Sequence, residues 1–336
     1  MTKLDRYRAC LLAGAIGDQL GNDVEFMTRG EMLAEYGPEG VKTMSRHITD
    51  DTQMTLFTAE GMLMGLKHGM PMPACVYQSY LDWYKTQMSR GKGGVFSKES
   101  VLMPVEALHA RRAPGNTCLS ALASGDMGTI EESINRSKGC GGVMRVAPCG
   151  LLKMLDTPDQ EDACAMQGAQ AAAITHGHAL GFVPAAMLAD MVRLIVADVG
   201  YTLEGIVADS LVRMQKLFGF LPQTTDFVRL MERAVQLAQS DLPIHEAIAE
   251  LGEGWVGEEA LAIALCCALR HQDDMAACLT AAVTHDGDSD STGAIAGNIL
   301  GAWLGVAGIP EDWLGQLEMR DVIDDMAHRL YEAAQT

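Results

Sequence analysis

Apolar residues recur at helical spacing along most of this 336-residue chain, and this periodicity restricts the fold more than any other feature. Two stripes are typical of buried helix faces. They consist of Leu56, Ala59, Leu63 and Leu66, and of Ile295, Ile299, Ala302 and Val306. Further helices are expected near 4–20, 73–87, 116–124, 142–155, 201–217, 226–239, 256–271 and 320–334. Alternating strand patterns are scarce and aromatic residues make up only 5% of the chain, so the sequence predicts an all-α fold.

The loops richest in Gly, Pro and Ser lie near 88–100, 111–116 and 136–142. None is long enough to act as a linker between domains, although a chain of this length could form one large domain or two small ones. We therefore expect one domain over residues 1–336. The segment Thr157-Pro158-Asp159-Gln160 has the pattern of a capping box, which predicts the start of another helix.

The formal net charge of −19 argues against nucleic acid or an anionic membrane surface as a partner. The nine cysteines are an odd number and include no Cys-x-x-Cys pair, which indicates reduced thiols in a cytoplasmic protein. The first apolar run is interrupted by Gly14, Gly17 and Asp18, so it does not fit a signal peptide. We expect no segment that is long and apolar enough to span a bilayer.

Two acidic clusters near opposite ends of the chain are the strongest chemical signal. The first is Thr49-Asp50-Asp51-Thr52, the second is Asp286-Gly287-Asp288-Ser289-Asp290-Ser291, and an apolar helical run follows each. Crowded carboxylates raise one another's pKa unless a cation neutralises them. Hard oxygen ligands suit Mg²⁺, Mn²⁺ or Ca²⁺. If the fold brings both clusters together, they predict a site for a pair of ions.

Each cluster also has a simpler interpretation. Asp, Ser and Thr are common helix N-caps, because their side-chain oxygens accept backbone N–H groups at the helix start. The second cluster resembles part of a calcium loop, but it lacks the glycine and the glutamate that an EF-hand requires. Capping and metal binding are compatible, since a capped helix start can still present ligands.

The segment from Gly14 to Phe26 contains three glycines at near-helical spacing, followed by a lone glutamate. The glycines either mark a helix end or allow close helix packing or close approach of a ligand. Glu25 lies between apolar Val24 and Phe26, so it is a candidate acid, base or metal contact.

Two later segments also carry polar chemistry. The glycine-rich run Ser137–Arg145 could present backbone N–H groups to an anion, or could be a flexible turn before a helix. It lacks the sequence of a P-loop or a dinucleotide fold. His176 and His178 are two residues apart and do not share a helix face, which disfavours zinc chelation. A histidine at a helix junction, bonded to backbone or substrate, fits better.

Taken in order, these segments resemble the ADP-ribosylglycohydrolase family. The resemblance extends from Gly14 to Trp303 and includes the segments Ala113–Thr117 and Gly254–Leu261. It implies an orthogonal all-α helical bundle with two Mg²⁺ or Mn²⁺ ions in a cleft.

The resemblance also implies roles for individual residues. The two metal-ligand groups correspond to Thr49, Asp50 and Asp51, and to Asp288, Asp290 and Ser291, the last a position where the family commonly has Thr. Glu25 corresponds to a mobile acidic residue over the substrate ribose, and His176 to a substrate-side histidine. The loop that holds the diphosphate corresponds to Gly139, Cys140, Gly141, Gly142, Val143 and Met144. Asp286 stands where the family often has Gly or Ser.

The implied activity is metal-dependent hydrolysis of the bond between ADP-ribose and a protein side chain, with arginine as the expected acceptor. Asp51 or Glu25 would then serve as the general base. Metal charge, Lys138, Arg145 and backbone N–H groups would offset the acidic surroundings at the diphosphate.

Two other classes of function stay open. A two-metal phosphoesterase would use the same carboxylates, because such sites serve phosphoryl transfer equally well. A non-enzymatic immunity protein would instead block an ADP-ribosyltransferase toxin by binding it directly.

Overall fold

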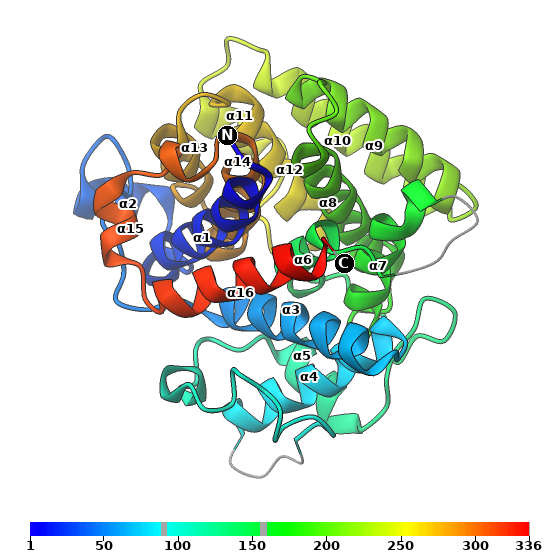
Figure 1. Cartoon of the computed structure of the whole chain (residues 1–336). Helices are drawn as coiled ribbons and strands as arrows, with labels where there is room; N and C mark the ends of the chain where they lie inside the picture. The colour runs from blue at the N-terminus through cyan, green and yellow to red at the C-terminus, as the bar shows by residue number, and fades with distance from the viewer. Residues whose placement is uncertain (89–92, 155–159, 336) are drawn as a thin grey trace.

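The computed structural model describes residues 1–88, 93–154 and 160–335. Within these ranges it contains sixteen α-helices and no strand, so the all-α prediction is confirmed (Figure 1). The α-helices are α1 (Lys3–Gly21), α2 (Arg29–Tyr36), α3 (Asp50–His68), α4 (Met72–Gln87), α5 (Asn116–Ser124), α6 (Ala147–Leu151), α7 (Ala163–Ala173), α8 (Ala179–Ala197), α9 (Leu203–Phe218), α10 (Gln223–Ala238), α11 (Ile244–Ala249), α12 (Gly257–Arg270), α13 (Met275–Val283), α14 (Ser289–Leu304), α15 (Glu311–Gln316) and α16 (Arg320–Ala333). Short 3-10 turns are η1 (Asn22–Val24), η2 (Glu106–His109), η3 (Cys140–Gly142), η4 (Gln160–Asp162) and η5 (Val306–Gly308).

Most predicted helices occur with ends within three residues of the expected ones, but the helix expected over 142–155 is wrong. In the described part of this range, residues 142–154, the one α-helix is α6 (Ala147–Leu151), with Pro148 in its first turn. Proline is favoured in the first turn of a helix and disfavoured further inside, so Pro148 favours a helix start near Ala147. The capping-box residues 157–159 lie outside the described residues.

Both apolar stripes end differently from the prediction. Leu66 is 45% exposed on α3, although Leu56 and Ala59 are buried. Val306 lies in η5, because Gly305 ends α14 with a φ of +75°. Each stripe therefore identifies its helix. The first stripe extends to an exposed residue of α3, and the second extends past the end of α14.

Helix α1 packs most extensively against α14, although the two are at opposite ends of the chain (Figure 1). Glycines line the contact. A Cβ at Gly17 would lie 2.0 Å from the carbonyl oxygen of Gly293, and one at Gly21 would lie 2.5 Å from the Cα of Asp290. Close helix packing therefore explains Gly17, while α1 ends at Gly21 as the helix-end interpretation predicted.

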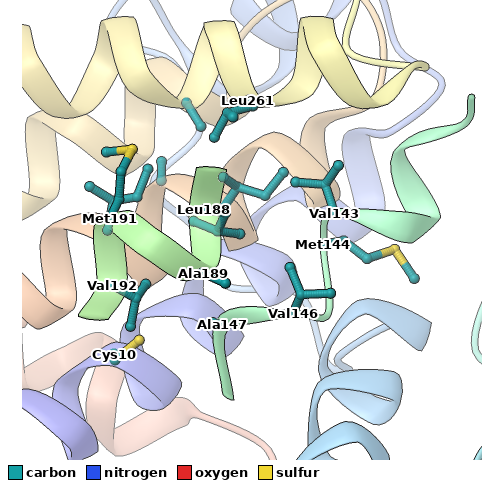
Figure 2. Close-up of a cluster of buried hydrophobic side chains, with 14 of the residues drawn as sticks. Cys10, Val143, Met144, Val146, Ala147, Leu188, Ala189, Met191, Val192 and Leu261 are labelled. Carbon is teal, nitrogen blue, oxygen red and sulfur yellow. The ribbon is translucent and has the colours of Figure 1, made fainter. Parts of the chain in front are cut away.

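Helix α8 lies in the core, where Leu188, Ala189, Met191 and Val192 pack near residues of the α1, η3–α6 and α12 regions (Figure 2). By length and composition α8 could cross a membrane, so the expectation that no segment is long and apolar enough was wrong. However, 83% of the apolar stretch is buried inside the protein. A helix that is apolar all round is typical of a protein core, and it lacks the one-sided stripe used for prediction.

The glycine contact predicts a specific effect on stability. Gly17→Ala should lower the free energy of unfolding by about 2 kcal/mol or more, because the new methyl group forces two helix backbones apart. Urea denaturation followed by circular dichroism measures the change. Gly315→Ala is the control, since nothing lies within 4 Å of its Cβ position. It should leave stability unchanged or raise it by up to about 1 kcal/mol. Equal stability of the two variants would contradict the role of this contact.

Candidate functional site

The two acidic clusters form the starts of α3 and α14. Thr49 is the N-cap of α3, and its hydroxyl accepts a hydrogen bond from the Asp51 N–H at 3.2 Å. Asp288 is the N-cap of α14, and its carboxylate accepts from the Ser291 N–H at 3.2 Å. The capping interpretation is therefore correct for both clusters. Each helix start also places its positive dipole end beside the carboxylates.

The contact between α1 and α14 brings the clusters together through Asp18. The Asp18 carboxylate accepts from the Thr49 N–H at 2.9 Å, the Thr52 N–H at 3.0 Å and the Thr52 hydroxyl. It is also close enough to Asp290 for that charge to raise its pKa, after burial, which is the larger cause. Asp18 thus joins α1 to the start of α3 while facing the start of α14.

Burial is the main cause of the raised pKa values of the aspartates in this cluster. It raises the pKa of Asp50 to about 8, with a smaller contribution from Asp290, although a hydrogen bond from the Gly115 N–H opposes the shift. Burial followed by Asp290 also raises the pKa of both Asp51 and Asp288. Carboxylates from both clusters therefore interact, and their simultaneous ionisation is unfavourable without a counter-charge.

The donor set fits a hard divalent cation. The Oδ1 atom of Asp51 is buried without a hydrogen-bond partner, and such an atom carries a desolvation penalty that a cation would remove. Within the described residues, no three His, Cys, Asp or Glu side chains stand ready as a metal site. Two of the aspartates instead accept hydrogen bonds from protein groups. Asp288 accepts from the Cys140 thiol at 2.7 Å, and Asp290 accepts from the Ser291 N–H at 2.9 Å.

Glu25 follows η1 (Asn22–Val24) and is half-buried beside the same cluster. Burial raises its pKa to about 8, with further contributions from Asp290, Asp50 and Asp18. The chain turn after α1 therefore places this glutamate near carboxylates from both ends of the chain.

The glycine-rich run lies along the second cluster. The Cys140 N–H donates to the Trp255 carbonyl at 3.2 Å, and the Gly257 N–H donates to the Lys138 carbonyl at 2.8 Å. The side chains of Val143 and Met144 are buried in the core (Figure 2), where the Met144 sulfur accepts from the Ser291 hydroxyl at 3.8 Å. Their side chains are therefore part of the core.

His176 is buried beneath this run. A Cβ at Gly141 would lie 3.2 Å from its ring, so a larger residue here would crowd the histidine. Burial and Arg145 lower the pKa of His176 to about 3, and the ring is therefore neutral. His178 caps α8 by accepting from the Leu180 N–H at 3.1 Å, which confirms the helix-junction role for one of the pair.

Two cations that were expected to offset the acidic surroundings at the diphosphate have partners within the protein. Arg145 is fully buried, donates to the Thr175 hydroxyl and lies 4.5 Å from the Tyr80 ring. Burial therefore keeps Arg145 from direct contact with a diphosphate, and its charge acts from within the core, where it interacts with Asp50. Lys138 forms an ion pair with Glu258.

Sequence reasoning missed Asp18, although it lay within a segment already singled out. The available signal was a single carboxylate inside an apolar, glycine-rich helix, since such a charge is rarely buried without a specific partner. It also missed that Gly115 contacts Asp50 and that the Cys140 thiol contacts Asp288.

Comparison with known proteins gives one consistent result. The ADP-ribosylglycohydrolase family model matches residues 1–336. The ADP-ribosyl-[dinitrogen reductase] glycohydrolase of Rhodospirillum rubrum is 27% identical, over 94% of this chain and 91% of that protein. The human ADP-ribosylhydrolase ARH3 is 25% identical, over 99% of this chain and 94% of that protein.

A solved structure described as an ADP-ribosylglycohydrolase-related protein complex has the same fold, with a TM-score of 0.64 at 24% identity and 99% coverage of both chains. The family match covers every segment that contributes to the carboxylate cluster. The chain therefore belongs to the ADP-ribosylglycohydrolase family, whose members act on ADP-ribosylated substrates.

Proposed function

We propose that this protein is a metal-dependent hydrolase that releases ADP-ribose from a modified protein side chain, with arginine as the acceptor. The observation that carries the proposal is the meeting of buried carboxylates from both ends of the chain beside Glu25 and the glycine-rich loop. The similarity to the Rhodospirillum rubrum glycohydrolase, whose substrate is an ADP-ribosylated protein by name, supports the substrate class.

Mg²⁺ or Mn²⁺ would be held by oxygen atoms of Thr49, Asp50, Asp51, Asp288, Asp290 and Ser291. Such an ion supplies Lewis acidity, and it lowers the pKa of a bound water. The buried, unpaired oxygen of Asp51 is the atom with most to gain from this binding.

The protein's own groups account for binding and proton transfer. Hydrolysis of a glycosidic bond needs a group that moves a proton near the anomeric carbon. Burial is the largest cause of the raised pKa of Glu25, so this carboxyl can exchange a proton closer to neutral pH than an ordinary glutamate, as an efficient acid or base should. Asp51 is the second candidate for this role.

The turn at Gly139–Gly142 is suited to a diphosphate, because glycine lets phosphate oxygens approach backbone N–H groups closely. Neutral His176 supports the turn from below without adding charge. Since Arg145 is buried and Lys138 is paired with Glu258, we expect backbone N–H groups rather than these cations to make the main phosphate contacts.

Incubation with arginine-ADP-ribosylated protein tests the activity. We expect free ADP-ribose in the presence of Mg²⁺ or Mn²⁺, and at least about 10²-fold slower release with chelator or in the Asp50→Ala, Asp288→Ala double variant. Chromatography of the products measures this. The control is Glu311→Gln, which removes an exposed carboxylate at the start of α15.

Other products would point to another function. AMP with ribose 5-phosphate would identify a phosphoesterase. A double variant that hydrolyses nothing, but still protects cells from an ADP-ribosyltransferase toxin, would identify a blocking protein.

The carboxylate cluster predicts a pH-dependent stability in chelator. Folded Asp18 and Asp50 keep protons up to pH about 7 and about 8, whereas their ordinary pKa is 3.8. Between these values the folded state binds more protons than the unfolded state, so the free energy of unfolding should fall as pH rises. Thermal melts across this range measure the slope.

Added Mg²⁺ or Mn²⁺ should raise the melting temperature more at alkaline than at acidic pH, because it binds ionised carboxylates. Asp50→Asn with Asp290→Asn should flatten the slope and remove the metal effect, while Glu311→Gln should change neither. A slope that is unaffected by the double substitution would show that other groups control it.

A further inference from the structure

Two contacts hold the short segment Glu25–Arg29 in place, one with Trp255 and one with Asp286 of the second acidic cluster. The Phe26 ring stacks on the Trp255 indole, with centroids 5.7 Å apart and planes inclined by 21°. Asp286 accepts a hydrogen bond from the Arg29 N–H at 2.7 Å, at the first residue of α2. Phe26 is the residue directly after Glu25, and Arg29 lies four residues after Glu25.

The aromatic pair is not part of the hydrophobic core. Phe26 is 81% exposed and Trp255 is 38% exposed. Because both rings are largely outside the core, burial in the core does not account for their position. The contact between the two rings does.

Trp255 belongs to a hydrogen-bonded framework around the site, and Asp286 lies two residues before Asp288 in the chain. The Trp255 carbonyl accepts from the Cys140 N–H of the glycine-rich loop. The Trp255 indole N–H donates to the Glu253 carboxylate at 3.2 Å, and the Glu253 carbonyl accepts from the Asp288 N–H at 2.8 Å. The contacts therefore fix the Glu25 segment relative to both the loop and the second carboxylate cluster.

The segment has few other restraints. Val24 is fully buried and anchors one end, and the Thr28 capping box organises the start of α2. Between them, Met27 donates its N–H to the Val24 carbonyl at 2.9 Å, while Glu25 and Met27 are only half-buried. Segments with so little burial open easily, so the position of Glu25 depends on the two anchors.

We propose that Trp255 and Asp286 are positioning residues that hold the Glu25 segment closed over the carboxylate cluster. The proposal rests on the proposed function only where it assigns Glu25 a part in hydrolysis. It also accounts for Asp286, the acidic residue that the family resemblance left without a role, because this carboxylate caps α2 from outside the helix.

Hydrogen exchange measured by mass spectrometry tests the anchoring directly. In Trp255→Ala and in Asp286→Ala, amides of residues 25–30 should exchange about 2- to 10-fold faster, as expected for loss of one stack or one hydrogen bond. Trp255→Phe keeps a ring and Asp286→Asn keeps an acceptor oxygen, so both should stay near the wild-type rate. Phe220→Ala and Asp273→Ala remove an exposed ring and an exposed acid elsewhere and are the matched controls.

Kinetics then test the consequence for the reaction. The two alanine variants should lower kcat by about 10-fold or more while KM changes little, because a displaced catalytic group costs rate more than binding. The phenylalanine and asparagine variants should restore kcat. Unchanged exchange in residues 25–30, or faster exchange spread over the whole protein, would overturn the proposal. If the wild-type protein released no ADP-ribose, the proposed function would fail, while the exchange data would still decide whether the segment is anchored.

Discussion

The site depends on the close contact between the backbones of α1 and α14. Because Gly17 and Gly293 have no side chains, the two helices approach to a distance that no larger residue allows. This contact sets Asp18 of α1 beside Asp290 of α14. Asp18 in turn binds the backbone at the start of α3, so the first acidic cluster is held next to the second. Helix packing and carboxylate placement are thus one structural feature.

The buried carboxylates differ in how their charge is compensated. Three donors from Thr49 and Thr52 satisfy Asp18, which suits a carboxylate that joins helices. Asp51 instead keeps an oxygen without any partner, although burial and neighbouring acids raise the pKa of both residues. Proteins rarely retain such an unfavourable group without a use for it. The contrast separates an aspartate that supports the architecture from one that is available for chemistry.

Much of this arrangement was predictable from sequence, but only where a pattern has a local cause. Amphipathic helices such as α10 and α16 were predicted by their stripes, and Thr49 and Asp288 by the chemistry of caps. Helix α8 was missed because it is buried on all sides. The burial of Arg145, the role of Asp18 and the bond from Asp286 to Arg29 depend on contacts between distant segments, and no local pattern encodes them.

The pairing of α1 with α14 also has a consequence for biosynthesis. Helix α1 is synthesised long before α14, so its glycine-lined face lacks its α14 partner until Gly293 and Gly297 have left the ribosome. Contacts between residues so far apart in sequence form late and slowly. During translation the apolar face of α1 therefore stays uncovered by α14. The two acidic clusters can come together only after α14 has emerged.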